Sequence, residues 1–397
     1  MIIERFFDAM RARPRNSAVD SFPEAIGYGA DLSVSGKMVT PETSRTIATA
    51  YRCGNIISDD VAKMPFQVFI KRGQQVEKLQ PNAFIRNMAY MLEIQPNRYW
   101  TPFLFKKTAM QWLLYWGNCY IWQPPGRMRE LYILPASSTC VVFDARGNRY
   151  FETTWASGET SVLPDVEVMH LMINSEDGYE GESIISYARE TIGRQLGAHE
   201  VQSKFYKQGM TAAGIIYAAG DLNKQAREKI RESYTEAVSG SGNVGKVAIF
   251  DSKITKFEPV SIKPNDAQFL ESIQATDLDI ANFFGLPLYK LNSGKQTYQS
   301  NEQQNLDYLS TTLDPYLVQW EQGAALKWLS MEEQSYTYFR FNRDSILRTD
   351  ASTRAAYLEK KIFSGQLTPN EARQIDDLSS YPGGDRHYVP SNMTAID

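Results

Sequence analysis

Apolar residues recur at helical spacing in one stretch of the chain, from Asp266 to Phe284. Phe269, Ile273, Ile280 and Phe283 follow one another at steps of four, seven and three residues. This spacing places all four on one face of a helix. Every charge in the stretch is acidic, and we expect these carboxylates to form a negative stripe on the opposite face: Asp266, Glu271, Asp277 and Asp279. At about 1.5 Å per residue the helix would be roughly 30 Å long. Gly285 and Pro287 predict its end.

A polar loop from Leu286 to Glu302 follows this helix, and a second helical pattern follows the loop. Loops of this length are uncommon in compact domains and are usually functional or disordered. Side chains suited to brief contact with a DNA backbone lie in the loop, although an ordinary solvated loop has a similar composition: Tyr289, Lys290, Asn292, Lys295 and Tyr298. The helical pattern then runs from Leu306 to Trp320, and Pro315 predicts a kink because proline removes one amide donor.

The first half of the chain predicts an α+β domain. Helical patterns run from Pro41 to Met64 and from Thr101 to Trp116, and a strand at residues 66–70 has a hairpin partner near Val76. Short strands separated by turn signals follow, at residues 119–123, 131–134, 140–144, 150–154 and 166–169. Strands this short and this closely spaced favour antiparallel pairing.

A second long helix is predicted from Ile184 to Lys207, and a small α/β insert separates it from the acidic helix. The insert reads as strands at 214–219, 246–250 and 256–262 with a charged helix at 223–238. The chain therefore leaves the body of the protein along one long helix and returns along the other. Near the C-terminus we expect a strand at 335–341 and helices at 351–363 and 369–375.

Composition and charge exclude several classes of protein. The 397 residues carry a formal net charge of -4 and are 43% hydrophobic, which is typical of a globular chain and argues against a broad basic face that grips nucleic acid. The three cysteines, Cys53, Cys119 and Cys140, lack metal-site spacing and indicate reduced thiols. We find no signal peptide or spanning helix; the apolar and basic residues 1–15 suit either a membrane-surface helix or an arm that docks on protein.

One motif suggests nucleotide binding, the stretch GSGNVGKV from Gly240 to Val247. A phosphate-binding loop runs from strand to helix and places Ser or Thr after the lysine. Here the predicted helix comes first, a strand follows, and Val247 holds the hydroxyl position, so a helix-to-strand turn is the better interpretation. His170, His199 and His387 have no partners at metal or triad spacing. We therefore predict a protein that is not an enzyme and needs no cofactor or metal.

Basic side chains gather on the first long helix, and two interpretations of them stay open: Arg189, Arg194, Lys204 and Lys207. They could touch phosphate, or they could form a solvated or inter-subunit face that pairs with the acidic helix of a neighbouring copy.

With these segments assembled, the chain resembles the portal proteins of tailed bacteriophages, the head-to-tail connectors of lambda-like long-tailed phages. The likeness runs from about Thr43 to the C-terminal tail and depends on the order of its segments, which are Thr49–Ile57, Asn118–Trp122 with Leu131–Pro135, Gly181–Gly209 followed by Gly214, Asp279–Pro287 and Gly365–Arg373.

The resemblance implies a multi-domain portal fold with an antiparallel-strand wing, two stem helices that flank a clip, a kinked helix after a tunnel loop and a helical crown. By analogy the parts are an arm (1–40), the first part of the wing (41–183), stem helix 1 (184–208), the clip (209–263), stem helix 2 (264–285), the tunnel loop (286–302), the rest of the wing (303–340) and the crown (341–397).

The resemblance also implies a function, which is to form a ring, typically of twelve subunits, at one capsid vertex, through which genomic DNA is packaged and ejected. Implied partners are double-stranded DNA in transit, the terminase large subunit, the major capsid protein or scaffold, and the head-completion adaptor proteins, with no membrane. The expected location is the virion, and the host cytoplasm during assembly. An acidic helix along the bore would repel phosphate and let DNA slide, because each neutralised phosphate adds affinity. Two alternatives stay open: a nucleotide-binding enzyme of DNA metabolism and a non-viral ring scaffold.

Overall fold

The computed structural model describes residues 33–126, 129–208, 214–218, 224–225, 228–229, 254–259, 266–291, 301–346, 351–375 and 378–388. The chain divides into two compact units. Unit 1 comprises Met1–Ser58, Thr108–Pro125 and Tyr132–Lys295, and unit 2 comprises Asp59–Lys107, Gly126–Leu131 and Gln296–Asp397. Helices and antiparallel sheets are mixed throughout, which confirms the predicted fold class.

Unit 1 contains two three-stranded antiparallel sheets. In the first, β3 (Asn118–Trp122) lies between β4 (Tyr132–Leu134) and β8 (Val168–Met172). In the second, β6 lies between β5 and β7, with bounds Thr139–Phe143 for β5, Arg149–Thr154 for β6 and Thr160–Pro164 for β7. Short 3-10 turns, Ala136–Ser138 and Asp165–Glu167, precede β5 and β8. All five residues of β3 are buried, so this strand forms the centre of the core.

Helices α3 (Ala48–Lys63) and α5 (Pro102–Trp116) contribute residues to both units, and in unit 1 they meet at a glycine. A Cβ added to Gly54 would lie 2.3 Å from the Tyr115 hydroxyl oxygen, so a larger residue would push the two helices apart. The Tyr115 hydroxyl donates to the Ala50 carbonyl at 3.0 Å. The short helix α2 (Pro41–Ser44) precedes α3, and Gly117, at φ +80, ends α5 as predicted.

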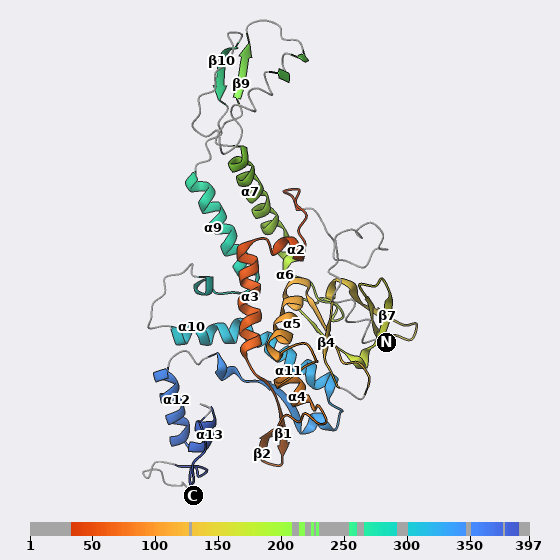
Figure 1. Ribbon diagram of the computed structural model, residues 1–397, viewed down its shortest axis with the longest axis vertical. Helices are drawn as coiled ribbons and strands as arrows, with labels where there is room; N and C mark the ends of the chain where they lie inside the picture. The colour runs from red at the N-terminus through yellow and green to blue at the C-terminus, as the bar shows by residue number, and fades with distance from the viewer. Residues whose placement is uncertain are drawn as a thin grey trace. The chain divides into compact units, whose positions relative to one another are not determined.

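The two long helices of unit 1 lie side by side (Figure 1). The first is interrupted, because α6 (Ile184–Tyr187) ends at Ala188 and α7 (Arg189–Gln208) begins at the next residue, whereas the sequence predicted one continuous helix. The second is α9 (Asp266–Phe283), as predicted, and the 3-10 turn Leu288–Leu291 follows it. Beyond them β9 (Gly214–Ala218) pairs antiparallel with β10 (Ile254–Pro259).

Unit 2 has a sheet in which β1 (Phe66–Arg72) lies between β11 (Thr337–Phe341) and β2 (Gln75–Lys78). The last segment of the predicted kinked helix packs on it. The segments of this helix are α10 (Asn301–Tyr308), a π-helical turn (Leu309–Leu313) and α11 (Asp314–Trp328). The helical pattern is therefore interrupted just before Pro315, where the sequence predicted a kink. Phe66 stacks on Phe341, with ring centroids 4.3 Å apart, and Trp320 packs edge-on against Phe66.

The remaining elements of unit 2 include α4 (Met88–Glu93) and the 3-10 turns Glu333–Ser335 and Arg343–Ser345. The C-terminal helices α12 (Ala351–Phe363) and α13 (Pro369–Ile375) begin and end where the sequence predicted. Within the described residues no helix is long and apolar enough to cross a membrane, and no cluster of three or more His, Cys, Asp or Glu side chains could hold a metal ion. The three cysteines are free thiols, two of them buried.

Candidate functional site: the paired long helices

The C-terminal end of α9 packs into unit 1 through three buried side chains, Ile280, Ala281 and Phe284. The Phe284 ring lies edge-on to Tyr115, with centroids 6.0 Å apart. Phe283, which we expected on the packed face, is 42% exposed, so that part of the prediction is wrong. The packed face lies about one residue further along the helix than the sequence pattern indicated.

Asp277 lies on this packed side and not on an exposed acidic stripe, so its predicted place in the stripe is wrong. Its Oδ1 accepts hydrogen bonds from the Thr49 hydroxyl and from Gln195 Nε2, the latter at 2.8 Å. Thr49 belongs to α3 and Gln195 to α7, so one carboxylate oxygen joins three helices. The reason is spacing, because residue 277 precedes the buried Ile280, Ala281 and Phe284 by three, four and seven positions, which is one helix face.

Asp279, in contrast, lies at the surface, with 53% of its side chain exposed. It forms a long ion pair with Arg194 of α7, whose Nη2 lies 4.0 Å from Asp279 Oδ2 and whose own side chain is 63% exposed. An ion pair this long and this exposed contributes about 0–1 kcal/mol to stability. It therefore does not fix either side chain, and both can meet another molecule at the surface.

We call Thr49, Arg194, Gln195, Asp277 and Asp279 the helix-pair junction.

The junction changes the chemistry of a neighbouring thiol. Burial, together with the negative charge of Asp277, raises the pKa of Cys53 to about 12. The thiol therefore stays protonated at neutral pH and does not act as a nucleophile.

The start of the predicted tunnel loop is held against unit 1. Gly285 adopts φ +63, and the buried Leu286 follows it. The Arg52 guanidinium donates to the Lys290 carbonyl at 3.3 Å, and Lys290 Nζ lies 5.9 Å from the centroid of the Tyr289 ring. Tyr289 and Lys290 are half-buried, so the described start of the predicted loop is fixed against α3.

A segment before α2 runs along α7, a contact that no pattern in the sequence predicts. The Val34 amide donates to Glu190 Oε2 at 3.0 Å, and Lys37 forms an ion pair with Glu200. Ser33 is buried against Gly193, where an added Cβ would lie 2.3 Å from the Ser33 hydroxyl oxygen. We call residues 33–37 the strap. Gly193 is therefore a contact point, whereas sequence analysis treats a glycine in a helix interior only as a weakness.

Several predicted site residues lie partly or wholly outside the described part of the molecule. Asn292, Lys295 and Tyr298 fall outside the described residues, as do the Gly240–Val247 stretch and the arm 1–32. The backbone of the long helices is described at four further positions, but their side chains are not, namely Asp266, Glu271, Lys204 and Lys207. Arg189 is half-buried at the start of α7. We expected the basic side chains of the first long helix to meet a neighbouring copy, and this stays a prediction.

Comparison with known proteins gives a consistent result. The chain is 26% identical over 377 residues to the portal protein of Enterobacteria phage HK97, covering 92% of this chain and 87% of that protein. It is 25% identical over 424 residues to a probable portal protein of Streptomyces phage phiC31, covering 98% of this chain and 90% of that protein.

Solved structures share the fold. A crystal structure of an HK97 family phage portal protein from Corynebacterium diphtheriae superposes with a TM-score of 0.57 at 14% identity, covering 77% of this chain and 96% of that one. A chain from the neck of a native gene transfer agent particle, computed with C12 symmetry, gives a TM-score of 0.54 at 18% identity, covering 86% and 92%. The family described as phage portal protein matches residues 48–377, so the chain belongs to the phage portal protein family and is a portal, the connector at a capsid vertex.

Proposed function

We propose that twelve copies of this chain form a closed ring through which double-stranded DNA enters and leaves the capsid. The observation that carries the proposal is the pairing of α7 and α9, which leaves the Asp279 carboxylate exposed on a helix that is fixed at its base by Asp277. The copy number follows the C12 symmetry of the neck particle whose chain shares this fold. Phage portals are structural proteins, and we propose that ATP hydrolysis is supplied by a separate motor.

The exposed side of α9 is the proposed wall of the channel. A ring places Asp279 of every copy at the same height, which makes a negative collar. DNA carries a negative charge about every 1.7 Å of its length, so such a collar keeps phosphates from binding and lets the duplex slide. Asp277 takes no part in the collar because its carboxylate binds Thr49 and Gln195 inside the subunit. Asp266 and Glu271 are proposed to extend the wall along the same helix.

The loop after α9 is the proposed point of contact with DNA. Tyr289 and Lys290 lie at its fixed base, and Asn292, Lys295 and Tyr298 follow them in the sequence. A few lysines on a loop that begins from a rigid base give a weak, localised grip, in contrast to the repulsive wall. Such a loop suits retention of packaged DNA better than tight binding.

The other parts are assigned by family analogy. We propose that the clip (209–263), whose strands β9 and β10 are paired, docks the terminase large subunit and later the head-completion adaptors. The wing (41–183 and 303–340) and the crown (341–397) face the major capsid protein or scaffold and the packaged DNA. Assembly begins in the host cytoplasm, and the mature location is the virion.

The test is charge reversal at the channel wall. In Asp279→Lys, the collar becomes positive, and we expect DNA packaging to slow several-fold because phosphates now bind the wall. Rings should still form, since the Asp279–Arg194 pair contributes little. Glu176→Lys, at an exposed loop of unit 1, makes the same charge change away from α9 and serves as the matched control. Equal packaging rates for both variants would show that Asp279 does not line the channel.

A further inference from the structure

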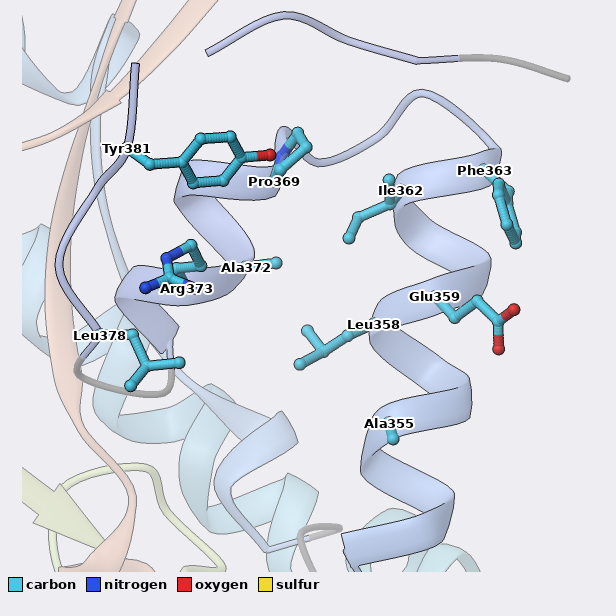
Figure 2. Close-up of a pocket in the computed structure, with 10 residues that line it drawn as sticks. All are labelled: Ala355, Leu358, Glu359, Ile362, Phe363, Pro369, Ala372, Arg373, Leu378 and Tyr381. Carbon is cyan, nitrogen blue, oxygen red and sulfur yellow. The ribbon is translucent and has the colours of Figure 1, made fainter. Parts of the chain in front are cut away.

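An apolar groove lies between α12 and α13 in unit 2, with a cavity of about 500 Å³. Figure 2 shows Leu358 and Ile362 of α12 pointing toward Ala372 and Leu378, while Glu359 points away. The groove is open to solvent. Three of its lining side chains are about half exposed, namely Phe363 at 52%, Leu378 at 49% and Tyr381 at 45%. Apolar surface that stays open in this way is typical of a docking site, and we call it the α12–α13 groove.

The far wall of the groove is fixed by one side chain, Asn370. Its Nδ2 donates to the Tyr381 carbonyl at 3.0 Å and to Asp385 Oδ1 at 2.7 Å, and its Oδ1 accepts from the Tyr381 amide at 2.9 Å. These bonds tie the segment after α13 back onto the start of that helix. The groove is therefore formed by the described residues themselves and does not need a partner to shape it.

The described part of the chain ends beside this wall. Gly384 is buried against Asn370, since an added Cβ would lie 2.4 Å from Asn370 Oδ1. The Tyr388 hydroxyl donates to the carbonyl of the preceding residue, Gly383, at 3.3 Å. Tyr381, two positions before Gly383, lines the groove. Tyr388 is the last described residue, so the residues that follow it start close to the groove.

The segment that follows has a sequence suited to the groove. Residues 389–397 lie outside the described part of the chain, and their sequence is VPSNMTAID. Its large apolar residues are separated by steps of four and three: Val389, Met393 and Ile396. This spacing gives the segment one apolar side. An apolar side of this kind laid in a groove between helices is a common way in which peptides bind proteins.

Charge also matches between the segment and the groove. The segment has one charged side chain, Asp397. Arg373 is the cation among the residues that line the groove, and it is fixed there because its Nε donates to the Ser379 carbonyl at 2.8 Å. The acidic lining residue, Glu359, points away from the groove (Figure 2). A carboxylate that enters the groove therefore meets an opposite charge.

The segment is long enough to fill the groove of its own copy. Nine extended residues span up to about 30 Å. The α12 side of the groove runs from Ala355 to Phe363, which is about 12 Å at the rise of a helix. A segment tethered at the rim meets its own groove at a high effective concentration, so it outcompetes the same segment of another copy.

We infer that residues 389–397 dock in the α12–α13 groove of the same copy, with their apolar side against α12 and Leu378. Burial of the open apolar walls stabilises the contact. The contact lies within one subunit and goes beyond the proposed function, since it requires neither a ring nor DNA. The two can therefore fail separately.

The first experiment measures hydrogen exchange of the segment by mass spectrometry. The double variant Met393→Asp, Ile396→Asp should release the segment and make its amides exchange at least tenfold faster than in the wild-type protein. Leu378 is half exposed, so Leu378→Asp tests the groove side without opening the core and should give the same increase. Thr394→Asp adds the same charge off the apolar side and should leave exchange unchanged. Wild-type exchange as fast as in the double variant or in Leu378→Asp would overturn the inference.

The second experiment tests which groove receives the segment. Phe363→Cys with Met393→Cys, in a Cys140→Ser background whose two remaining native thiols are buried, should give a link within one chain with a short bis-maleimide, identified by peptide mass mapping. Tyr357→Cys, on α12 but not among the residues that line the groove, replaces Phe363→Cys in the control and should give at least five times less link. A link between two copies, or equal yields from both pairs, would overturn the assignment.

Discussion

At the scale of single residues, Asp277 and Asp279 lie only two positions apart on α9 but have different surroundings. A helix turns about 100° per residue, so these carboxylates point in directions about 200° apart. Asp277 accepts hydrogen bonds from donors on α3 and α7, whereas Asp279 is exposed and forms only a long ion pair with Arg194 among the described residues. The first is part of the structure of the subunit, and the second is available for function.

Removing each carboxylate should separate the two roles. Asp277→Ala leaves the Thr49 hydroxyl and the Gln195 amide without their acceptor, and we expect the free energy of unfolding to fall by about 1–3 kcal/mol. Asp279→Ala removes only an exposed pair and should change it by less than about 0.5 kcal/mol. Urea denaturation of the two variants measures both values, and equal losses would contradict the assignment.

A buried lysine in unit 2 predicts a dependence of stability on pH. Lys106 is 5% exposed and donates from Nζ to the Met64 carbonyl. Burial lowers its pKa from 10.5 to about 8, against the attraction of Glu93. Between these two values the unfolded chain binds more protons than the folded chain, so the stability contribution of Lys106 rises with pH from about 8 to 10.5.

The comparison with Lys106→Met isolates this effect, because other titrating groups are common to both proteins. Across that window the wild-type protein should gain about 3 kcal/mol relative to the variant. Thermal or urea unfolding at half-unit pH steps gives the two curves. Parallel curves would mean that the ammonium group is not buried in the folded protein.

At the scale of elements, the strap can pack on α7 because Gly193 has no side chain. Gly193→Ala places a methyl group where Ser33 lies, with Cβ 2.3 Å from the serine oxygen, so the strap must move away. We expect faster hydrogen exchange at the Val34 amide, which otherwise donates to Glu190. Gly197 is the matched control, because the nearest atom to an added Cβ there is Ser35 Cβ at 3.9 Å.

Gly197→Ala should keep the strap protected and stabilise α7 by about 0.5–1 kcal/mol, since alanine favours a helix more than glycine does. Exchange at the strap measured by mass spectrometry, together with the unfolding curves of both variants, checks the pair. An unchanged strap in Gly193→Ala would show that residues 33–37 do not depend on this contact.

The elements themselves were mostly predictable, and the misses have physical causes. The helix ends of α12 and α13 follow from strong local signals, such as Gly365 and Pro369. Strand β7 was missed because only one of its five residues, Leu163, is buried, so its apolar pattern is weak. The break at Ala188 was missed because no glycine or proline marks it in the sequence.

The candidate site was less predictable than the elements. The acidic charge of α9 was visible in the sequence, but its face was not, because the nearest partners of Asp277 are distant in the chain: Thr49 lies 228 residues away and Gln195 lies 82 residues away. Contacts across such separations depend on the folded arrangement and leave no periodic signal. The strap had none for the same reason, and family resemblance supplied the roles that single residues could not.

At the scale of the whole molecule, the chain belongs to a family of structural proteins, and we propose that it guides DNA without hydrolysing nucleotide. Calorimetric titration of the purified chain with ATP should therefore show no binding, and Lys246→Ala should behave as the wild-type protein does. Saturable binding that disappears in Lys246→Ala would favour the nucleotide-binding alternative over a passive channel. The Gly240–Val247 stretch supports that alternative only by its sequence.

The central claim is that copies of this chain surround an axial hole with α9 on its wall. Electron cryomicroscopy of the purified full-length chain tests it most directly. We predict a closed ring of 45.1 kDa subunits in which α9 lines the opening and Asp279 of every copy faces it. A protein that stays monomeric, or a ring whose α9 helices face outward with Asp279 away from the hole, would contradict the account.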